Sequence, residues 1–227
     1  MAAYSNAMKE SLPETLPNDP LPMVARWLDD ARREIRNAIA NATEGHGPSS
    51  SMTLATVDPM GRPSARMVIC RGFDPSAGWL VFYTDRESEK GKDLAEHPRA
   101  SCVFHWSALE RQIRIDGPVT LAPDADSDAY WLTRPLDARV AAVASRQSRP
   151  LETRAEFLAR IAEIAKTAGD AIPRPARWGG YRLWAERVEL WAGQPARAHD
   201  RARWTRALTV IADGFKGGAW SSTRLQP

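Results

Sequence analysis

Cysteine and histidine are scarce in this sequence, and long apolar runs are missing. The 227 residues include only two cysteines, Cys70 and Cys102, and four histidines. Two cysteines cannot build a disulfide framework, and so few scattered Cys and His side chains disfavour a zinc site. No apolar stretch approaches the roughly 20 residues of a membrane helix, and we expect no signal peptide. We therefore expect a cytoplasmic protein with no membrane partner and no bound metal.

Lysine is scarce as well. The chain has five lysines but 26 arginines, and its formal net charge is only +3. Because acids and bases nearly balance and no basic block occurs, nucleic acid is not an expected partner. Genome composition explains most of the arginine surplus, but guanidinium groups also bind phosphate or carboxylate in a bidentate manner. Some arginines are therefore candidates for holding an anionic small molecule.

Local patterns predict a short arm followed by one domain. Residues 1–19 are polar and contain two prolines, with a third at Pro20, which is typical of a flexible N-terminal arm. Residues 20–227 are long enough for a single domain. Apolar residues at helical spacing, among them Trp27, Ile35 and Ile39, predict a helix over 20–41.

The rest of the chain favours strands over helices. Further helices are expected over 88–97, 124–132 and 153–168, with an Arg- and Ser-rich loop before the last one. Alternating apolar residues and turn signals predict strands over 52–57, 63–70, 80–84, 100–106, 111–121, 181–183, 187–192, 203–210 and 220–225, and a turn over 214–218. Hairpin spacing with helices at the ends and in one insertion predicts a β-barrel with helical additions, an α+β fold.

The most unusual stretch carries Arg197, His199 and Arg201 at alternate positions. In a strand, alternate residues point to one face, so two guanidinium groups would flank an imidazole there. Such a face inside a barrel needs an anionic or electron-rich partner. The alternative interpretation is a solvated edge strand.

Three further stretches suit a phosphate-bearing ligand. Arg66 begins an otherwise apolar strand, a position that suits the rim of a phosphate site. Thr84, Ser88 and Lys90 offer hydroxyls and an ammonium group near a helix N-terminus, although they also fit a plain helix cap. Gln112 would face into a half-buried sheet, where its amide needs polar partners.

The residues of these segments and their order along the chain resemble the pyridoxine/pyridoxamine 5′-phosphate oxidase family. The resemblance also takes in its close branch, the phenazine-biosynthesis flavin oxidases, and runs from about Pro20 to Pro227. The segments that carry it are Arg66 to Arg71, Val81 to Thr84, His97 to Ser101, Leu109 to Gln112, Ser145 to Pro150, Trp178 to Arg182, Glu189 to Trp191 and Arg197 to Arg201.

This resemblance implies an FMN-binding split barrel that works as a homodimer, with FMN at the subunit interface. It implies oxidation of pyridoxamine or pyridoxine 5′-phosphate to pyridoxal 5′-phosphate, by hydride transfer to the flavin with O₂ as electron acceptor. The positions that match FMN binding are Arg66, Met67, Val68, Ile69, Cys70, Arg71, Tyr83, Thr84, Lys90, Gln112, Gln147, Ser148, Trp191 and Arg201. The positions that match substrate binding are Arg71, Tyr130, Arg134, Arg197 and His199, of which Arg197 and His199 are the catalytic pair.

Several positions depart from the family pattern. Arg71 stands where lysine is usual, Glu89 replaces a cation near the flavin phosphate, and Ala138 replaces a serine at the substrate phosphate. An Arg- and Tyr-bearing substrate segment is also not recognisable over 1–20. Two alternatives therefore stay open: a phenazine-type oxidase acting on dihydrophenazine carboxylates, and a flavin-binding barrel without catalysis.

Overall fold

The computed structural model describes residues 10–38, 51–167 and 172–227. The helices are α1 (Leu21–Ala38), α2 (Glu89–Glu96), α3 (Asp124–Thr133), α4 (Leu136–Ala144) and α5 (Arg154–Thr167). The strands are β1 (Ser51–Val57), β2 (Pro63–Ile69), β3 (Gly72–Asp74), β4 (Trp79–Asp85), β5 (Arg99–Trp106), β6 (Arg111–Leu121), β7 (Trp178–Trp184), β8 (Arg187–Ala192), β9 (Asp200–Thr205), β10 (Leu208–Ile211), β11 (Gly214–Gly217) and β12 (Ser221–Leu225). None of the described helices is long and apolar enough to cross a membrane.

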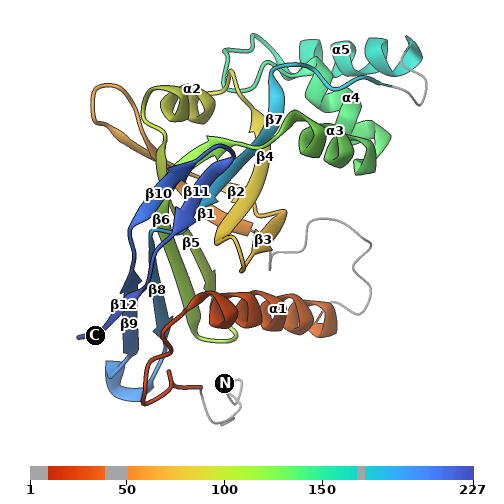
Figure 1. Ribbon diagram of the computed structural model, residues 1–227. Helices are drawn as coiled ribbons and strands as arrows, with labels where there is room; N and C mark the ends of the chain where they lie inside the picture. Colours follow the sequence, from red (N-terminus) through yellow and green to blue (C-terminus); the bar gives the residue numbers. More distant parts are fainter. Residues whose placement is uncertain (1–9, 39–50, 168–171) are drawn as a thin grey trace.

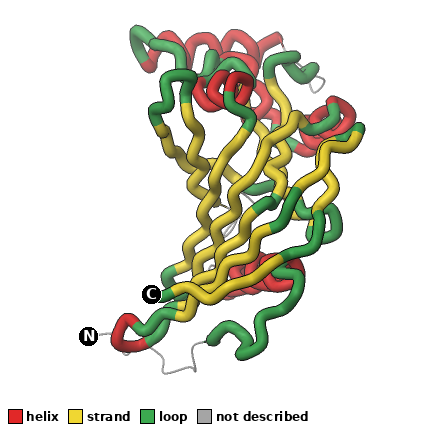
Figure 2. The backbone as a smooth tube through the Cα atoms, turned by 60° about the vertical axis from the view of Figure 1, so that its left-hand side comes forward, coloured by secondary structure: helices red, strands yellow, loops and turns green. Residues whose placement is uncertain are grey.

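Ten strands form one curled antiparallel sheet. Its main path runs β12-β9-β8-β6-β5-β1-β2, while β7 joins β6 to β4, and β4 pairs with β3. The long strand β6 changes partner along its length: residues 111–116 pair with β8, and residues 119–121 pair with β7. This change of partner curls the sheet into the half-barrel seen in Figures 1 and 2, which agrees with the predicted barrel class.

One glycine permits this change of partner. Gly117 lies on β6 between the two pairing segments, and a Cβ there would stand 1.8 Å from the carbonyl oxygen of Trp184. No side chain fits at that distance from a backbone atom, so the two chain segments can approach only at glycine.

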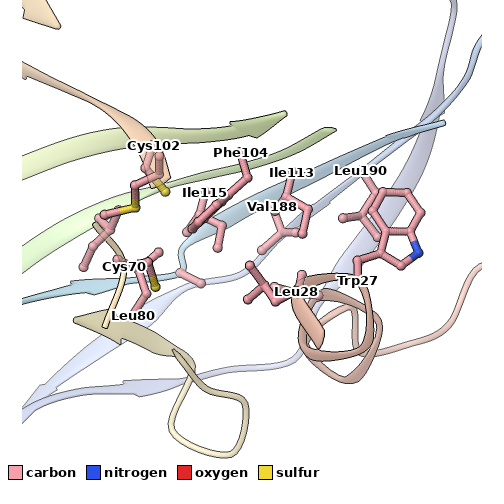
Figure 3. Close-up of a cluster of buried hydrophobic side chains, with 14 of the residues drawn as sticks. Trp27, Leu28, Cys70, Leu80, Cys102, Phe104, Ile113, Ile115, Val188 and Leu190 are labelled. Carbon is pink, nitrogen blue, oxygen red and sulfur yellow. The ribbon is translucent and has the colours of Figure 1, made fainter. Parts of the chain in front are cut away.

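The core lies inside the curl of the sheet, between the strands and α1 (Figure 3). Strand β1 alternates buried and partly buried residues, as the period-two pattern predicts. Helix α1 begins after Asp19, whose Oδ1 accepts a hydrogen bond from the Leu21 N–H at 2.9 Å, and it buries Trp27 and Leu28 against the strands. The predicted helical position Ile39 lies outside the described residues.

Residues 10–19, which belong to the expected flexible arm, pack against the sheet. Leu12 is buried in the core, and its N–H donates to Asp200 Oδ2 at 2.8 Å. Trp204 Nε1 donates to the Pro17 carbonyl at 2.8 Å, and Glu10 forms an ion pair with Arg111. These contacts tie the segment to β6 and β9.

The structure differs from the sequence-based elements at four places. Helix α4 lies within the stretch expected as a loop, and the short strand β3 was not expected. The predicted strand over 203–210 is wrong as a single unit, because it divides into β9 and β10 at Arg206, whose side chain turns inward to the Ala185 carbonyl. The predicted turn over 214–218 is also wrong, since Gly214–Gly217 is strand β11 and pairs with β10.

Candidate functional site

A cavity of about 760 Å³ lies between strands β2, β4 and β7 and the helices α3 and α4. A volume of this size suits a cofactor or a substrate with part of a cofactor. Its lining residues are Arg66, Met67, Val68, Ile69, Arg71, Tyr83, Thr84, Asp85, Lys90, Tyr130, Arg134, Ala138, Ala141, Ala142, Ser145, Gln147, Phe157 and Trp178.

Lys90 supplies a buried ammonium group to this cavity. Its side chain extends from the first turn of α2, and its Nζ donates to Thr84 Oγ1 at 3.2 Å, Ser88 Oγ at 3.2 Å and Gln147 Oε1 at 2.8 Å. Burial, together with the charge of Arg66, lowers the pKa of Lys90 to about 8. Among the described residues no carboxylate forms an ion pair with it, so its charge is available to an anion.

Arg66 supplies a second cation from strand β2. Its Nη1 donates to Thr56 Oγ1 at 2.6 Å and its Nη2 to Ser64 Oγ at 2.9 Å. Asp93 lies farther away, with Oδ2 3.8 Å from Arg66 Nη2, and it accepts a hydrogen bond from Thr56 at 2.6 Å. Burial lowers the pKa of Arg66, while Asp93 favours its charged form. The two cations and the neighbouring hydroxyls make a cradle for a phosphate group.

Stacked aromatic rings form one wall of the cavity. The ring of Tyr83 lies 4.2 Å from that of Tyr130 and 5.5 Å from that of Trp178, with interplanar angles of 19° and 10°. Arg71 Cζ lies 5.4 Å from the Tyr130 ring centre, and Arg134 Cζ lies 4.8 Å from the Trp178 ring centre. Flat apolar surfaces flanked by cations suit a flat aromatic ligand that carries an anionic group.

Arg134 has an unused donor. Its Nη2 donates to the Ala138 carbonyl at 3.0 Å, but its Nη1 is buried and has no hydrogen-bond partner in the described part of the chain. Burial lowers the pKa of Arg134 and raises the pKa of the neighbouring Tyr130, whose phenol therefore stays protonated. Buried polar atoms are nearly always paired in folded proteins, so an unpaired guanidinium donor in a cavity marks a place for a ligand.

A second group of predicted residues lies on β6, β8 and β9. Gln112 is opposite Trp191 across β6 and β8, and Trp191 is opposite Arg201 across β8 and β9. Arg201 Nη2 donates to Glu189 Oε1 at 2.7 Å, and Glu189 is buried. None of these residues lines the cavity.

The predicted arrangement of Arg197, His199 and Arg201 on one strand face is wrong. Strand β8 ends at Ala192, strand β9 begins only at Asp200, and a short 3₁₀ turn, Pro195–Arg197, lies between them. The φ angle of Arg197 is +61°, in the left-handed region that no strand residue occupies. Proline has no N–H for a strand ladder, so Pro195 is incompatible with a continuous pair of central strands.

The turn still places His199 next to Trp191. His199 Nδ1 accepts a hydrogen bond from the Gln194 N–H at 3.2 Å, and the His199 ring centre lies 4.6 Å from that of Trp191. Arg197 is exposed. Two consecutive left-handed residues, Ala196 and Arg197, are a strained backbone of the kind that concentrates at functional sites.

The structure therefore divides the predicted site residues between two places in the chain. The connection from β8 to β9 lies at the opposite end of the molecule from α3 and α4 in both Figure 1 and Figure 2. The residues brought together in the cavity are Arg66, Met67, Val68, Ile69, Arg71, Tyr83, Thr84, Lys90, Tyr130, Arg134 and Gln147. Those at the other end are Gln112, Trp191, Arg197, His199 and Arg201.

Two predicted residues lie in neither group. The Cys70 thiol is in the core (Figure 3), where burial raises its pKa to about 11 and its Sγ donates to the Gly72 carbonyl at 3.3 Å. Only the backbone of Cys70 could therefore face a ligand. Ser148, with a φ of +67°, lines an adjoining cavity of about 420 Å³.

Several cavity residues carried no signal that the sequence patterns singled out. Trp178 is the first residue of β7, whereas the predicted strand began only at residue 181. Asp85 is the last residue of β4, one position beyond the predicted strand over 80–84. Ala141 and Ala142 were missed with helix α4, although Pro135 at its start is a helix-start signal in the sequence.

Known proteins with similar sequences point to one family. The family model described as "Pyridoxamine 5'-phosphate oxidase" matches residues 40–168, and that of the "Pyridoxine 5'-phosphate oxidase C-terminal dimerisation region" matches residues 178–227. A pyridoxine/pyridoxamine 5′-phosphate oxidase from Ralstonia nicotianae is 44% identical over 92% of this chain and 89% of its own length. The corresponding protein from Gluconobacter oxydans is 41% identical over 92% of this chain and 94% of its own length.

A solved structure with the same fold supports this assignment. PhzG from Burkholderia lata, in complex with tetrahydrophenazine-1-carboxylic acid, superposes with a TM-score of 0.78 at 29% identity, over 96% of this chain and 100% of its own. An FMN-binding, pyridoxamine 5′-phosphate oxidase-related protein from Nostoc punctiforme shares the fold, with a TM-score of 0.66 at 20% identity over 96% of this chain and 100% of its own. The chain thus belongs to the pyridoxamine 5′-phosphate oxidase family of oxidoreductases.

Proposed function

We propose that this protein is an FMN-dependent oxidase that converts pyridoxamine or pyridoxine 5′-phosphate to pyridoxal 5′-phosphate, with O₂ as electron acceptor. The observation that carries the proposal is the cavity, in which a cationic cradle adjoins an aromatic wall. Relatives named pyridoxine/pyridoxamine 5′-phosphate oxidase, at 44% identity, support the choice of substrate. We expect the reaction to take place in the cytoplasm.

The residues of the cavity fit FMN. Lys90 is buried and Arg66 is partly buried, and the hydrogen bonds of both cations go to neutral oxygens. The carboxylate of Asp93 lies farther from Arg66, at 3.8 Å. A phosphate group would accept from both, and the capped N-terminus of α2 at Ser88 adds a favourable dipole. The apolar strand residues Met67, Val68 and Ile69 and their backbone would then lie along the flavin.

The substrate would lie in the same cavity, next to the cofactor. Arg71, Tyr130 and Arg134 would hold its phosphate, and the unpaired Arg134 Nη1 offers a donor for that purpose. When bound, FMN supplies the hydride acceptor for oxidation at C4′ of the pyridine, and the protein supplies binding, orientation and electrostatics.

The second group of residues would complete the site from the partner subunit. The family includes a C-terminal dimerisation region, which covers residues 178–227 and therefore β8, β9 and the turn between them. In a two-fold dimer each subunit can present this end to the other subunit's cavity. We infer that the Gln112, Trp191 and Arg201 of one subunit approach the FMN held by the other.

Arg197 and His199 would then act on the substrate. Because His199 Nδ1 accepts the Gln194 N–H, the neutral imidazole carries its proton on Nε2, which can donate to the substrate. Arg197 is exposed and can turn toward an anionic ligand. Together they would hold the substrate in a reactive pose and stabilise charge that develops during transfer.

The experiment that tests this function is direct. Purified protein loaded with FMN is incubated with pyridoxamine 5′-phosphate in air, and pyridoxal 5′-phosphate and peroxide are measured. The proposal predicts both products at rates far above a control with free FMN. A rate equal to that control would overturn the proposal.

A phenazine-type oxidase is the second candidate, and two observations favour it. Ala138 lines the cavity without a hydroxyl for a substrate phosphate, and the PhzG structure is similar over nearly the whole chain. The same reaction with a dihydrophenazine carboxylate separates the two candidates, because turnover of that substrate without turnover of pyridoxamine 5′-phosphate would favour the second.

A further inference from the structure

We propose that Arg177 is a positioning residue that sets the affinity of the cavity for phosphate. It would do so by holding Gln147 against Lys90 from behind the cavity wall. This inference rests on the proposed function, in which the phosphate belongs to FMN. Arg177 itself does not line the cavity.

Arg177 fastens the C-terminal end of helix α4. Its Nη2 donates to the carbonyls of Ala142, Val143 and Ser145 at 3.1, 3.0 and 2.9 Å. The last carbonyls of a helix have no partners within the helix, and a guanidinium group there also complements the helix dipole. The chain leaves this capped end directly into Gln147, so the cap fixes where the loop begins.

The same guanidinium group fastens the start of helix α2. Arg177 Nε donates to Asp85 Oδ2 at 3.0 Å, and only 16% and 8% of these two side chains are exposed. Asp85 in turn organises the turn before α2, because its Oδ1 accepts from the Glu87 N–H at 2.8 Å and its carbonyl accepts from Ser88 Oγ at 2.6 Å. Ser88 is the N-cap of the helix that carries Lys90.

Both fastened ends meet at the phosphate cradle. Gln147 Oε1 accepts from Lys90 Nζ at 2.8 Å and from Thr84 Oγ1 at 2.9 Å. One side chain, Arg177, therefore joins the two segments whose side chains form this contact. Without it, the α4 end would lose three hydrogen bonds, and Asp85 would be a buried carboxylate beside the cradle with its charge unpaired.

The test is a titration of apoprotein with FMN and, in parallel, with riboflavin, which lacks the phosphate. The variant is Arg177→Met, and the matched control is Arg182→Met. Arg182 is also 16% exposed and also ion-paired, with Asp126 at 2.7 Å, but it does not line the cavity. A double-mutant cycle with Gln147→Ala asks whether Arg177 acts through Gln147.

We expect Arg177→Met to raise the Kd for FMN at least tenfold and the Kd for riboflavin less than threefold, while Arg182→Met stays within twofold of wild type. In the Gln147→Ala background, Arg177→Met should raise the Kd for FMN by less than a further twofold. The inference would be overturned if Arg177→Met weakened FMN and riboflavin binding by the same factor, or left the Kd for FMN unchanged. It would also be overturned if Arg177→Met still raised the Kd for FMN tenfold in the Gln147→Ala background.

A second variant covers the case in which Arg177→Met does not fold. Arg177→Lys keeps the charge near Asp85 but cannot reach Asp85 and three carbonyls together, so it should raise the Kd for FMN and speed hydrogen exchange of the amides of 145–149. An Arg177→Lys protein with wild-type affinity and exchange would contradict the inference. Failure of wild-type apoprotein to bind FMN would instead overturn the proposed function, and this inference with it.

Discussion

One buried cation and two partly buried cations define the site at the scale of single residues. Lys90, Arg66 and Arg134 each lose solvation, and their pKa values are lowered by burial. Keeping such groups charged costs stability unless they gain partners of opposite charge. In the described chain these partners are mostly hydroxyl, amide and carbonyl oxygens, which leaves their charge for an anionic ligand.

The affinity for FMN is expected to depend on pH through Lys90. Its pKa of about 8 belongs to the protein without ligand, and a bound phosphate dianion would raise it. Affinity should therefore be constant just below pH 8 and fall as the pH rises above 8, by up to about tenfold per unit. Titration of apoprotein with FMN between pH 7 and 10 measures this slope.

Two variants make that measurement specific. In Lys90→Met the affinity should be weak and should no longer fall above pH 8. In Lys92→Met the affinity and its slope should match the wild type, because Lys92 is exposed on the same helix. A slope that persists in Lys90→Met would assign the pH dependence to another group.

His199 is expected to affect the rate of FMN reduction more than the affinity for FMN. His199→Ala removes the proposed Nε2 donor, so reduction of bound FMN by pyridoxamine 5′-phosphate should slow by about a hundredfold or more. The Kd for FMN should change little, since His199 is assigned to the substrate. Anaerobic stopped-flow and an FMN titration give the two values, and equal losses in both would contradict the assigned role.

At the scale of elements, strand β6 decides the shape of the sheet. It pairs with β8 along one part and with β7 along another, and Gly117 lies between them against the Trp184 carbonyl. The cavity depends on this geometry because β7 also pairs with β4, and β4 carries the cavity residues Tyr83 and Thr84.

Gly117→Ala should destabilise the protein by about 1–3 kcal/mol, because the new Cβ forces two backbone segments apart. Chemical denaturation measures the free energy of unfolding. The control is Gly218→Ala, where a Cβ would meet the Ala207 carbonyl oxygen at an ordinary 3.4 Å. Equal stability of Gly117→Ala and wild type would show that β6 does not need glycine at its change of partner.

Most elements could be predicted from local patterns, and the exceptions have physical causes. Strand β1 follows strict alternation, and α2 has a serine cap, so both were expected at nearly their observed positions. Helix α4 is short and alanine-rich, with a weak contrast between its faces, and so its pattern was not distinctive. The break between β9 and β10 depends on the buried contact of Arg206 with Ala185, which no local pattern encodes.

The site was predictable in its chemistry but not in its arrangement. The residue types and order of Arg66, Thr84 and Lys90 indicated a phosphate cradle, and these residues do meet in one cavity. The spacing of Arg197 and His199 indicated a strand, whereas the Pro195 turn gives them a different geometry. Arg177 carried no signal, because its partners on α4 and β4 lie far away in sequence.

At the scale of the whole molecule, the two groups of predicted residues lie at opposite ends of one subunit (Figure 1). A single subunit therefore cannot bring His199 to the cavity that holds Arg134. The dimerisation region contains His199, which is the arrangement required for an exchange of site residues between partners. We therefore propose that each active site is built by two subunits.

Subunit complementation tests this claim most directly. Arg134→Ala impairs the cavity and His199→Ala impairs the end that reaches the partner, so each variant alone should have little oxidase activity. In a mixed dimer, one of the two sites would combine both wild-type contributions. Co-refolding the two FMN-loaded variants should therefore restore pyridoxal 5′-phosphate formation, with about half the wild-type activity in the purified mixed dimer. A purified mixed dimer that binds FMN but stays as inactive as its parents would contradict the account.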